Sequence, residues 1–278
     1  MHDNPTKKFN YFLKGTSDKA VLFIHGITGT PSEMRYQAKA LNKAEFNVMC
    51  NALPRHCSTL GELKKATWNE IADACEHDLL TLNNDYRKVF VGGISMGAVM
   101  SVHLAFKHPH RVSGIIALAP TLFYDGRALH KGQVLMDLVW HIPVIRNMID
   151  IRESWPYGLK DEELRSQIER FYRGAIAKKF DNKALLFGSP FFPLSCLYQH
   201  HILAKRVKKE LPQVKNPILI LHAKEYDRTR SKNARYLYDH IGSADKNLIE
   251  LENSYHMVTI DLDKDRVAQE MIAFLNNH

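Results

Sequence analysis

Ser95 lies at the centre of the sequence Gly93-Ile94-Ser95-Met96-Gly97. A serine hydroxyl is a weak nucleophile near neutral pH, and it becomes reactive when a histidine accepts its proton and a carboxylate orients that histidine. The G-x-S-x-G pattern is typical of a strained turn that exposes the serine between a strand and a helix. The same five residues can also form a purely structural turn. A catalytic serine therefore requires the right flanking elements and two partners.

The histidine and the carboxylate are both expected after Ser95, each on a loop that follows a late strand. The stretch 247–251 is typical of a strand, and the loop after it contains His256. We interpret His256 as the general base. The buried strand expected at 217–223 is followed by two carboxylates, Glu225 and Asp227.

Glu225 and Asp227 could both face the histidine, because successive side chains of an extended chain point to opposite sides. We assign the acid to Asp227, since its shorter side chain has fewer rotamers to immobilise. We expect Glu225 to pair in solvent with Lys224 or Arg228. Both carboxylates remain eligible at this point.

The elements around Ser95 fit the catalytic interpretation. The run Val89-Phe90-Val91 is uninterrupted by polar residues, as a strand covered on both faces should be. The apolar segment 97–105 that follows predicts a helix, and it ends before Pro109. Further strands are predicted at 20–24, 47–50 and 115–119, and amphipathic helices at 68–82 and 266–275. The alternation of strands and helices predicts a mostly parallel sheet flanked by helices.

The strand at 20–24 leads directly into His25-Gly26-Ile27. A backbone N–H on such a loop, together with the N–H after the nucleophile, can bind the oxyanion of an acyl-transfer intermediate. We assign these two donors to Ile27 and Met96. The alternative is a loop that only caps the next helix, for which Thr30-Pro31 supplies a start signal. His56 precedes the serine, and we interpret it as a loop-packing residue.

Between residues 121 and 212 the alternation stops, and helical patterns, prolines and aromatic residues take its place. We interpret 121–212 as a mainly helical cap, inserted after the strand that follows the nucleophile helix. The core would then comprise 1–120 and 213–278. Most cap aromatics should form the small core of the cap itself, and a few should face an acyl pocket. We propose Phe191 and Trp155 as such substrate-binding residues.

The composition is that of an ordinary globular protein, with 278 residues, of which 45% are hydrophobic and 24% charged. There is no signal-like segment and no long apolar run, so a cytoplasmic protein is expected. The four cysteines lack C-x-x-C spacing and no H-E-x-x-H occurs, so we predict reduced thiols and no metal. The net charge of +8 permits weak association with a membrane surface. Its densest cluster, 205–209, is more typical of a solvated helix face than of a nucleic-acid site.

With these residues placed, the chain resembles the α/β-hydrolase superfamily over nearly its whole length. The segments HGITGTP, GISMGA and NSYHMVTIDLDKDRV are similar to bacterial carboxylesterases and monoacylglycerol lipases. The chain departs from these proteins at two points. It has Pro54-Arg55-His56-Cys57 where they commonly read P-G-H-G, and Asp227 stands one position later than their aspartate, which aligns with Tyr226.

The resemblance implies an α/β-hydrolase fold and hydrolysis of a carboxylic ester of short to medium acyl chain without a cofactor. It assigns Ser95, Asp227 and His256 to the triad, and Ile27 and Met96 to the oxyanion hole. The substrate partner would be a small ester or an acylglycerol. A monoacylglycerol lipase is the alternative within the same chemistry, and a non-catalytic binding protein on a hydrolase fold is the alternative of another class.

Overall fold

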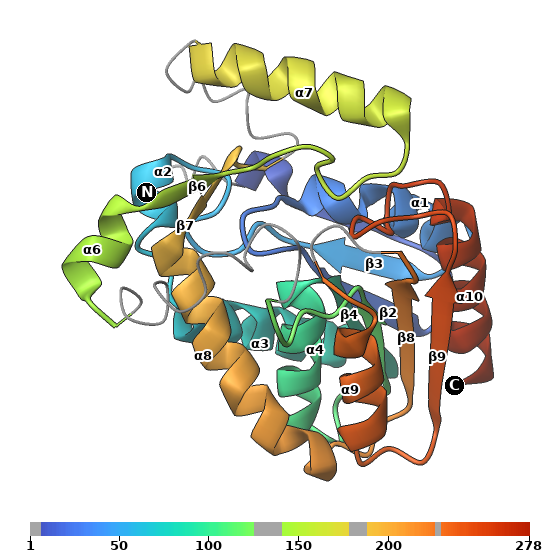
Figure 1. The fold of residues 1–278 in the computed structure, drawn as a ribbon. Helices are drawn as coiled ribbons and strands as arrows, with labels where there is room; N and C mark the ends of the chain where they lie inside the picture. The colour runs from blue at the N-terminus through green and yellow to red at the C-terminus, as the bar shows by residue number, and fades with distance from the viewer. Residues whose placement is uncertain (1–6, 125–140, 178–187, 226–228) are drawn as a thin grey trace.

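The computed structural model describes residues 7–124, 141–177, 188–225 and 229–278, and a central sheet runs through it (Figure 1). The strand order is β1-β3-β2-β4-β5-β8-β9. Only β1 is antiparallel to its neighbour, and the other neighbouring pairs are parallel. The strands are β1 (Tyr11–Leu13), β2 (Lys19–Ile24), β3 (Asn47–Cys50), β4 (Lys88–Ile94), β5 (Gly114–Leu118), β8 (Ile218–Ala223) and β9 (Lys246–Leu251).

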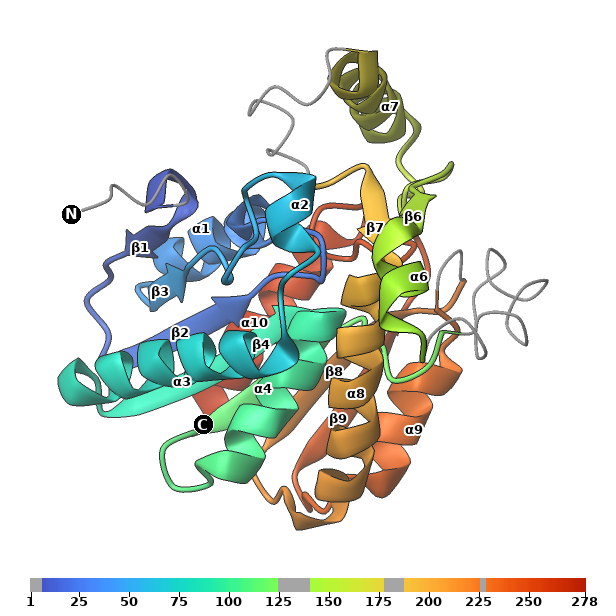
Figure 2. The same cartoon turned by 90° about the vertical axis from the view of Figure 1, so that its left-hand side faces the viewer.

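Helices cover both faces of the sheet (Figure 2). One face is buried under α1 (Arg35–Lys43), which follows the 3-10 turn η2 (Pro31–Met34), and under α10 (Lys264–Asn277). The other face is buried under α3 (Trp68–Asp85), α4 (Met96–Lys107), α8 (Leu194–Glu210) and α9 (Lys232–His240). The short elements η1 (Lys7–Phe9), α2 (Leu60–Leu63) and η4 (Leu211–Gln213) lie in the connections.

Strand β4 shows why the sequence forms this sandwich of layers. Its side chains alternate between the two cores, with Val89 and Val91 on the α3/α4 side and Phe90 and Ile94 on the α1/α10 side. All four are at most 1% exposed. An apolar run without alternation therefore marks a strand buried on both faces, and the predicted mostly parallel sheet flanked by helices is confirmed.

One part of the segment between β5 and β8 lies beyond the ends of the sheet strands, and another part packs on the core. Helix α6 (Pro143–Met148), the antiparallel pair β6 (Asp150–Arg152) and β7 (Phe191–Pro193), and α7 (Glu162–Ala177) lie beyond the carboxyl ends of the sheet strands (Figure 1). Helix α8 instead packs on the core, where Leu203 and Val207 are fully buried. The division into a core and a cap at 121–212 stays a prediction, although the last part of this range lies in the helical layer of the core.

The sequence did not reveal β1, β6 or β7, each of which is three residues long. The four cysteines are free and buried. In the described ranges, no helix is long and apolar enough to cross a membrane.

Candidate active site

Ser95 lies on a sharp turn between β4 and α4, with φ 57° and ψ −111°. Few non-glycine residues adopt this backbone conformation, and it points the hydroxyl away from both elements. A Cβ at Gly93 would lie 2.3 Å from the Ile24 carbonyl oxygen, and one at Gly97 would lie 2.0 Å from the same atom. Both glycines are therefore required by the close approach of β2, which explains their spacing around the serine.

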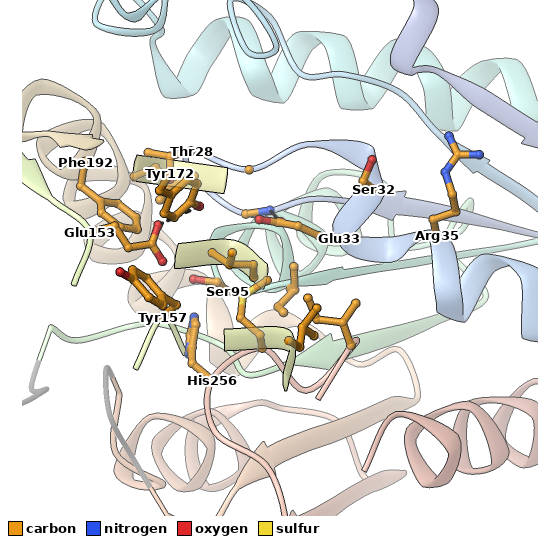
Figure 3. Close-up of a pocket in the computed structure, with 18 residues that line it drawn as sticks. Thr28, Ser32, Glu33, Arg35, Ser95, Glu153, Tyr157, Tyr172, Phe192 and His256 are labelled. Atoms are coloured by element: carbon orange, nitrogen blue, oxygen red, sulfur yellow. Dashed lines mark hydrogen bonds between the residues drawn. The ribbon is translucent and has the colours of Figure 1, made fainter. Parts of the chain in front are cut away.

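Ser95 opens onto a cavity of about 290 Å³. Figure 3 shows the imidazole of His256 next to the Ser95 hydroxyl on the floor of this cavity. The Ser95 hydroxyl also lies 3.1 Å from the hydroxyl of Thr121, which follows β5. The structure thus brings the predicted nucleophile and the predicted base together, although they are far apart in the sequence.

The loop that carries His256 is held by two buried aspartates. Asp261 accepts hydrogen bonds from the backbone N–H groups of Tyr255, at 2.7 Å, and of Lys160 and Asp161, at 2.8 and 2.9 Å. Asp263 accepts from the Asn253 N–H and the Ser254 hydroxyl. The Asp261 carboxylate therefore holds together the loop that carries His256 and the segment that leads into α7. Sequence analysis did not identify this role.

Of the two candidate acids, Asp227 lies outside the described residues. Glu225 is exposed, and its carboxylate lies 3.0 Å from the Lys160 ammonium group. Lys224 pairs with Glu252 instead of Glu225. The expected solvent position of Glu225 is thus observed with a different partner, and the assignment of the acid to Asp227 stays a prediction.

The loop from His25 to Gly29 carries one of the two predicted oxyanion donors. The Gly26 N–H donates to the Glu33 carboxylate at 2.8 Å, and Glu33 occupies the space that a Cβ at Gly29 would need. Among the described residues, the N–H of Ile27 has no backbone acceptor. Met96 is the first residue of α4, so its N–H has no acceptor within the helix. The assignment of the oxyanion donors to Ile27 and Met96 stays a prediction.

Two buried histidines contact the backbone carbonyl groups of this loop. The Leu53 N–H donates to Nε2 of His25, so the proton of the neutral ring is on Nδ1 and is donated to the Gly26 carbonyl. Burial lowers the pKa of His25 to about 3. His56 lies with Nε2 2.6 Å from the Ile27 carbonyl oxygen, and burial lowers its pKa as well. His56 therefore packs in a loop, as predicted, and the loop it supports is the oxyanion loop.

The loop in which the chain departs from P-G-H-G has its basic residue turned away from the cavity. Arg55 is ion-paired with Glu62 and Glu70, both at 3.0 Å. Arg55 and Cys57 have φ values of 63° and 54°. These positive values explain why glycines suit both positions.

The side chains that line the cavity are mainly apolar or aromatic. They include neither of the two substrate-binding residues proposed from the sequence, Phe191 and Trp155. Phe192, not Phe191, lines the cavity. Trp155 is 55% exposed, lies outside the cavity wall and stacks against the Arg165 guanidinium. The lining residues from the segment before β8 are Glu153, Tyr157, Leu164, Ile168, Tyr172 and Phe192.

Glu153 is a carboxylate in this mainly apolar wall, and sequence analysis missed it. The Tyr172 hydroxyl donates to it at 3.2 Å. Figure 3 shows Glu153 and Tyr157 facing Ser95 from the other side of the cavity. The alternation of charged and apolar residues around 150–155 gives no signal that would single out Glu153, because its position depends on the pairing of β6 with β7.

The mostly parallel sheet flanked by helices and the strained serine turn after β4 are those of an α/β-hydrolase. Residues 15–263 match the family described as serine aminopeptidase, S33, and the chain belongs to this family. It is 26% identical over 258 residues to a thermostable monoacylglycerol lipase of Bacillus sp. (strain H-257), covering 93% of this chain and 90% of that one. It is 22% identical over 270 residues to a carboxylesterase of Bacillus subtilis (strain 168), covering 95% of each.

Solved structures show the same fold. One from a study of two metagenome-derived lipolytic enzymes, LipS and LipT, matches with a TM-score of 0.81 and 24% identity over 99% of both chains. The resemblance predicted from the sequence motifs is therefore confirmed at the level of the superfamily and of its lipase and esterase relatives.

Proposed function

We propose that this protein hydrolyses carboxylic esters through an acyl-enzyme intermediate on Ser95. The main support is the strained turn that presents the Ser95 hydroxyl to a cavity that His256 also lines. Membership of a hydrolase family and the esterase and lipase relatives support it. The disfavoured serine conformation between two glycines also favours catalysis over a non-catalytic binding role, because backbone strain of this kind concentrates at functional sites.

In the proposed mechanism, Ser95 attacks the ester carbonyl while His256 accepts the hydroxyl proton. The N–H groups of Ile27 and Met96 donate to the oxyanion of the tetrahedral intermediate. His256 then protonates the leaving alcohol, and the same steps with water release the acid. Asp227 is proposed to orient His256. No cofactor is needed for this sequence of steps.

The cavity suggests an acyl chain of short to medium length. Its volume of about 290 Å³ is at the lower end of the range of roughly 300 to 1,000 Å³ for small-molecule sites. Apolar side chains such as Ile168, Phe192 and Ile260 line it, so its walls suit methylene groups.

A monoacylglycerol is the second candidate substrate, and Glu153 is the observation that favours it. A carboxylate in an apolar pocket can accept hydrogen bonds from hydroxyl groups, and a glycerol ester retains two of these after acylation. The pair of Glu153 and Tyr172 would then bind the alcohol part of the substrate while Phe192 contacts the acyl part.

The proposed function is tested with three matched substrates: a simple alkyl ester, a monoacylglycerol with the same acyl chain, and an aminoacyl amide. We expect hydrolysis of both esters by the wild type and none by Ser95→Ala. Glu153→Gln should lower kcat/KM for the monoacylglycerol about 10-fold, as expected for one hydrogen bond to a charged group, and leave the alkyl ester within about 2-fold. Preferential cleavage of the amide would contradict ester hydrolysis, and equal effects of Glu153→Gln on both esters would exclude glycerol recognition.

A further inference from the structure

A continuous series of buried hydrogen bonds leads from His256 into the sheet. Nδ1 of His256 lies 3.1 Å from the Thr229 hydroxyl. The same hydroxyl lies 3.4 Å from Nε2 of His222, the penultimate residue of β8. Nδ1 of His222 lies 2.8 Å from the Ala223 carbonyl oxygen. The three side chains are at most 7% exposed, so these contacts are shielded from solvent.

The carbonyl at the end of the series fixes the proton of His222, and the directions of the other two bonds follow when both Thr229 contacts are hydrogen bonds. A carbonyl oxygen only accepts, so Nδ1 of His222 must carry a proton. In the neutral ring Nε2 of His222 is then an acceptor, and the Thr229 O–H donates to it. The lone pairs of the Thr229 oxygen are left to accept from His256, which requires the proton of His256 to be on Nδ1. Nε2 of His256 is then unprotonated, which is the tautomer that a general base needs.

We propose that Thr229 and His222 are positioning residues that hold His256 in the tautomer and orientation of a general base, in addition to the carboxylate of the triad. This inference rests on the proposed function of His256. We call the hydrogen-bonded series of the Ala223 carbonyl, His222, Thr229 and His256 the relay. The Thr229 hydroxyl is uncharged, so the relay orients the His256 ring without compensating the positive charge that this ring acquires during catalysis. Its removal should therefore cost less than removal of the acid.

Thr229→Val tests the relay, because valine has the shape of threonine and lacks only the hydroxyl. We expect kcat to fall about 10-fold, in proportion to one hydrogen bond to an ionised group, with KM within about 2-fold. Thr229→Ser keeps the hydroxyl and should stay close to the wild type. Circular dichroism and the urea midpoint establish that each variant is folded.

His222→Leu extends the test, because without its acceptor the Thr229 hydroxyl can turn and donate to Nδ1 of His256, which favours the wrong tautomer. We expect the double variant Thr229→Val/His222→Leu to be no slower than His222→Leu alone. Fully additive losses would show two separate packing effects and overturn the relay. So would a Thr229→Val variant with the kcat of the wild type.

Nitrogen-15 NMR of the histidine rings tests the relay without any ester. We expect both His222 and His256 of the wild type as Nδ1–H tautomers, and a change of the His256 signals in Thr229→Val but not in Thr229→Ser. A His222 ring protonated on Nε2 would overturn the relay even in an active enzyme. Absence of ester turnover in the wild type, with the expected tautomers present, would instead refute the proposed function and leave the hydrogen-bonded series established.

Discussion

Replacing Asp261 by asparagine should destabilise the protein and slow catalysis together, because one buried carboxylate holds both the His256 loop and the entry to α7. One of its oxygens accepts from the N–H groups of Lys160 and Tyr255, and the other accepts from that of Asp161. Asp261 is 0% exposed, so water cannot replace a lost acceptor. In Asp261→Asn the amide oxygen can retain the first two bonds, and the amide NH2 then faces the Asp161 N–H.

The magnitude follows from these contacts. A hydrogen bond to a charged group contributes about 1.5 to 3 kcal/mol and one between neutral groups about 0.5 to 1.5 kcal/mol. Loss of one charged bond and weakening of the other two to neutral strength should lower the free energy of unfolding by about 3 to 6 kcal/mol. Looser placement of His256 should lower kcat by about 10-fold or more, since small displacements of a catalytic group are costly.

Urea unfolding and ester turnover measure the two effects on the same samples. Glu252→Gln is the matched control, because it makes the same chemical change in the same loop at a carboxylate that is 67% exposed and paired with Lys224. We expect the control to change the free energy of unfolding by less than about 1 kcal/mol. An Asp261→Asn variant as stable and as active as Glu252→Gln would show that the Asp261 carboxylate does not hold the His256 loop in place.

Three further predictions concern pH, the acid and the cavity. Burial lowers the pKa of both His25 and His200, a buried residue of α8, to about 3, so both stay neutral in the folded protein while the unfolded chain takes up protons below pH 6.5. The stability that they contribute is therefore present above pH 6.5 and should fall by about 3 kcal/mol per pH unit between pH 6.5 and 3, and equal urea midpoints at pH 7 and 5.5 would contradict this. Asp227→Asn should lower kcat by about 10⁴ and Glu225→Gln by less than about 2-fold, as kinetics on one short ester would measure, and the reverse order would assign the acid to Glu225. Phe192→Ala should shift the preferred acyl length across a series of esters of graded chain length, while short esters are still cleaved. An unchanged preference would show that Phe192 does not contact the acyl chain.

The sequence predicted those parts of the molecule in which local patterns decide the structure. The run Val89-Phe90-Val91 indicated a strand buried on both faces because no polar residue could be tolerated there. The glycines around Ser95 indicated the turn because the G-x-S-x-G pattern consists of neighbouring residues. These features require no knowledge of distant residues.

Other parts of the site depend on contacts between segments that are far apart in the chain. Phe192 rather than Phe191 faces the cavity because the register of a three-residue strand is set by its partner β6, and a shift of one residue exchanges the two faces. Asp261 looked like one more charged residue because two of its partners are about one hundred positions earlier in the sequence. No pattern of neighbouring residues predicts such a contact.

Labelling with a fluorophosphonate, followed by tandem mass spectrometry, tests whether Ser95 is the nucleophile. We expect one adduct per chain, located on the peptide that contains Ser95, and no adduct on a Ser95→Ala variant whose circular dichroism is unchanged. An adduct that persists in folded Ser95→Ala, or a folded wild type that takes no label and cleaves no ester, would contradict this role of Ser95.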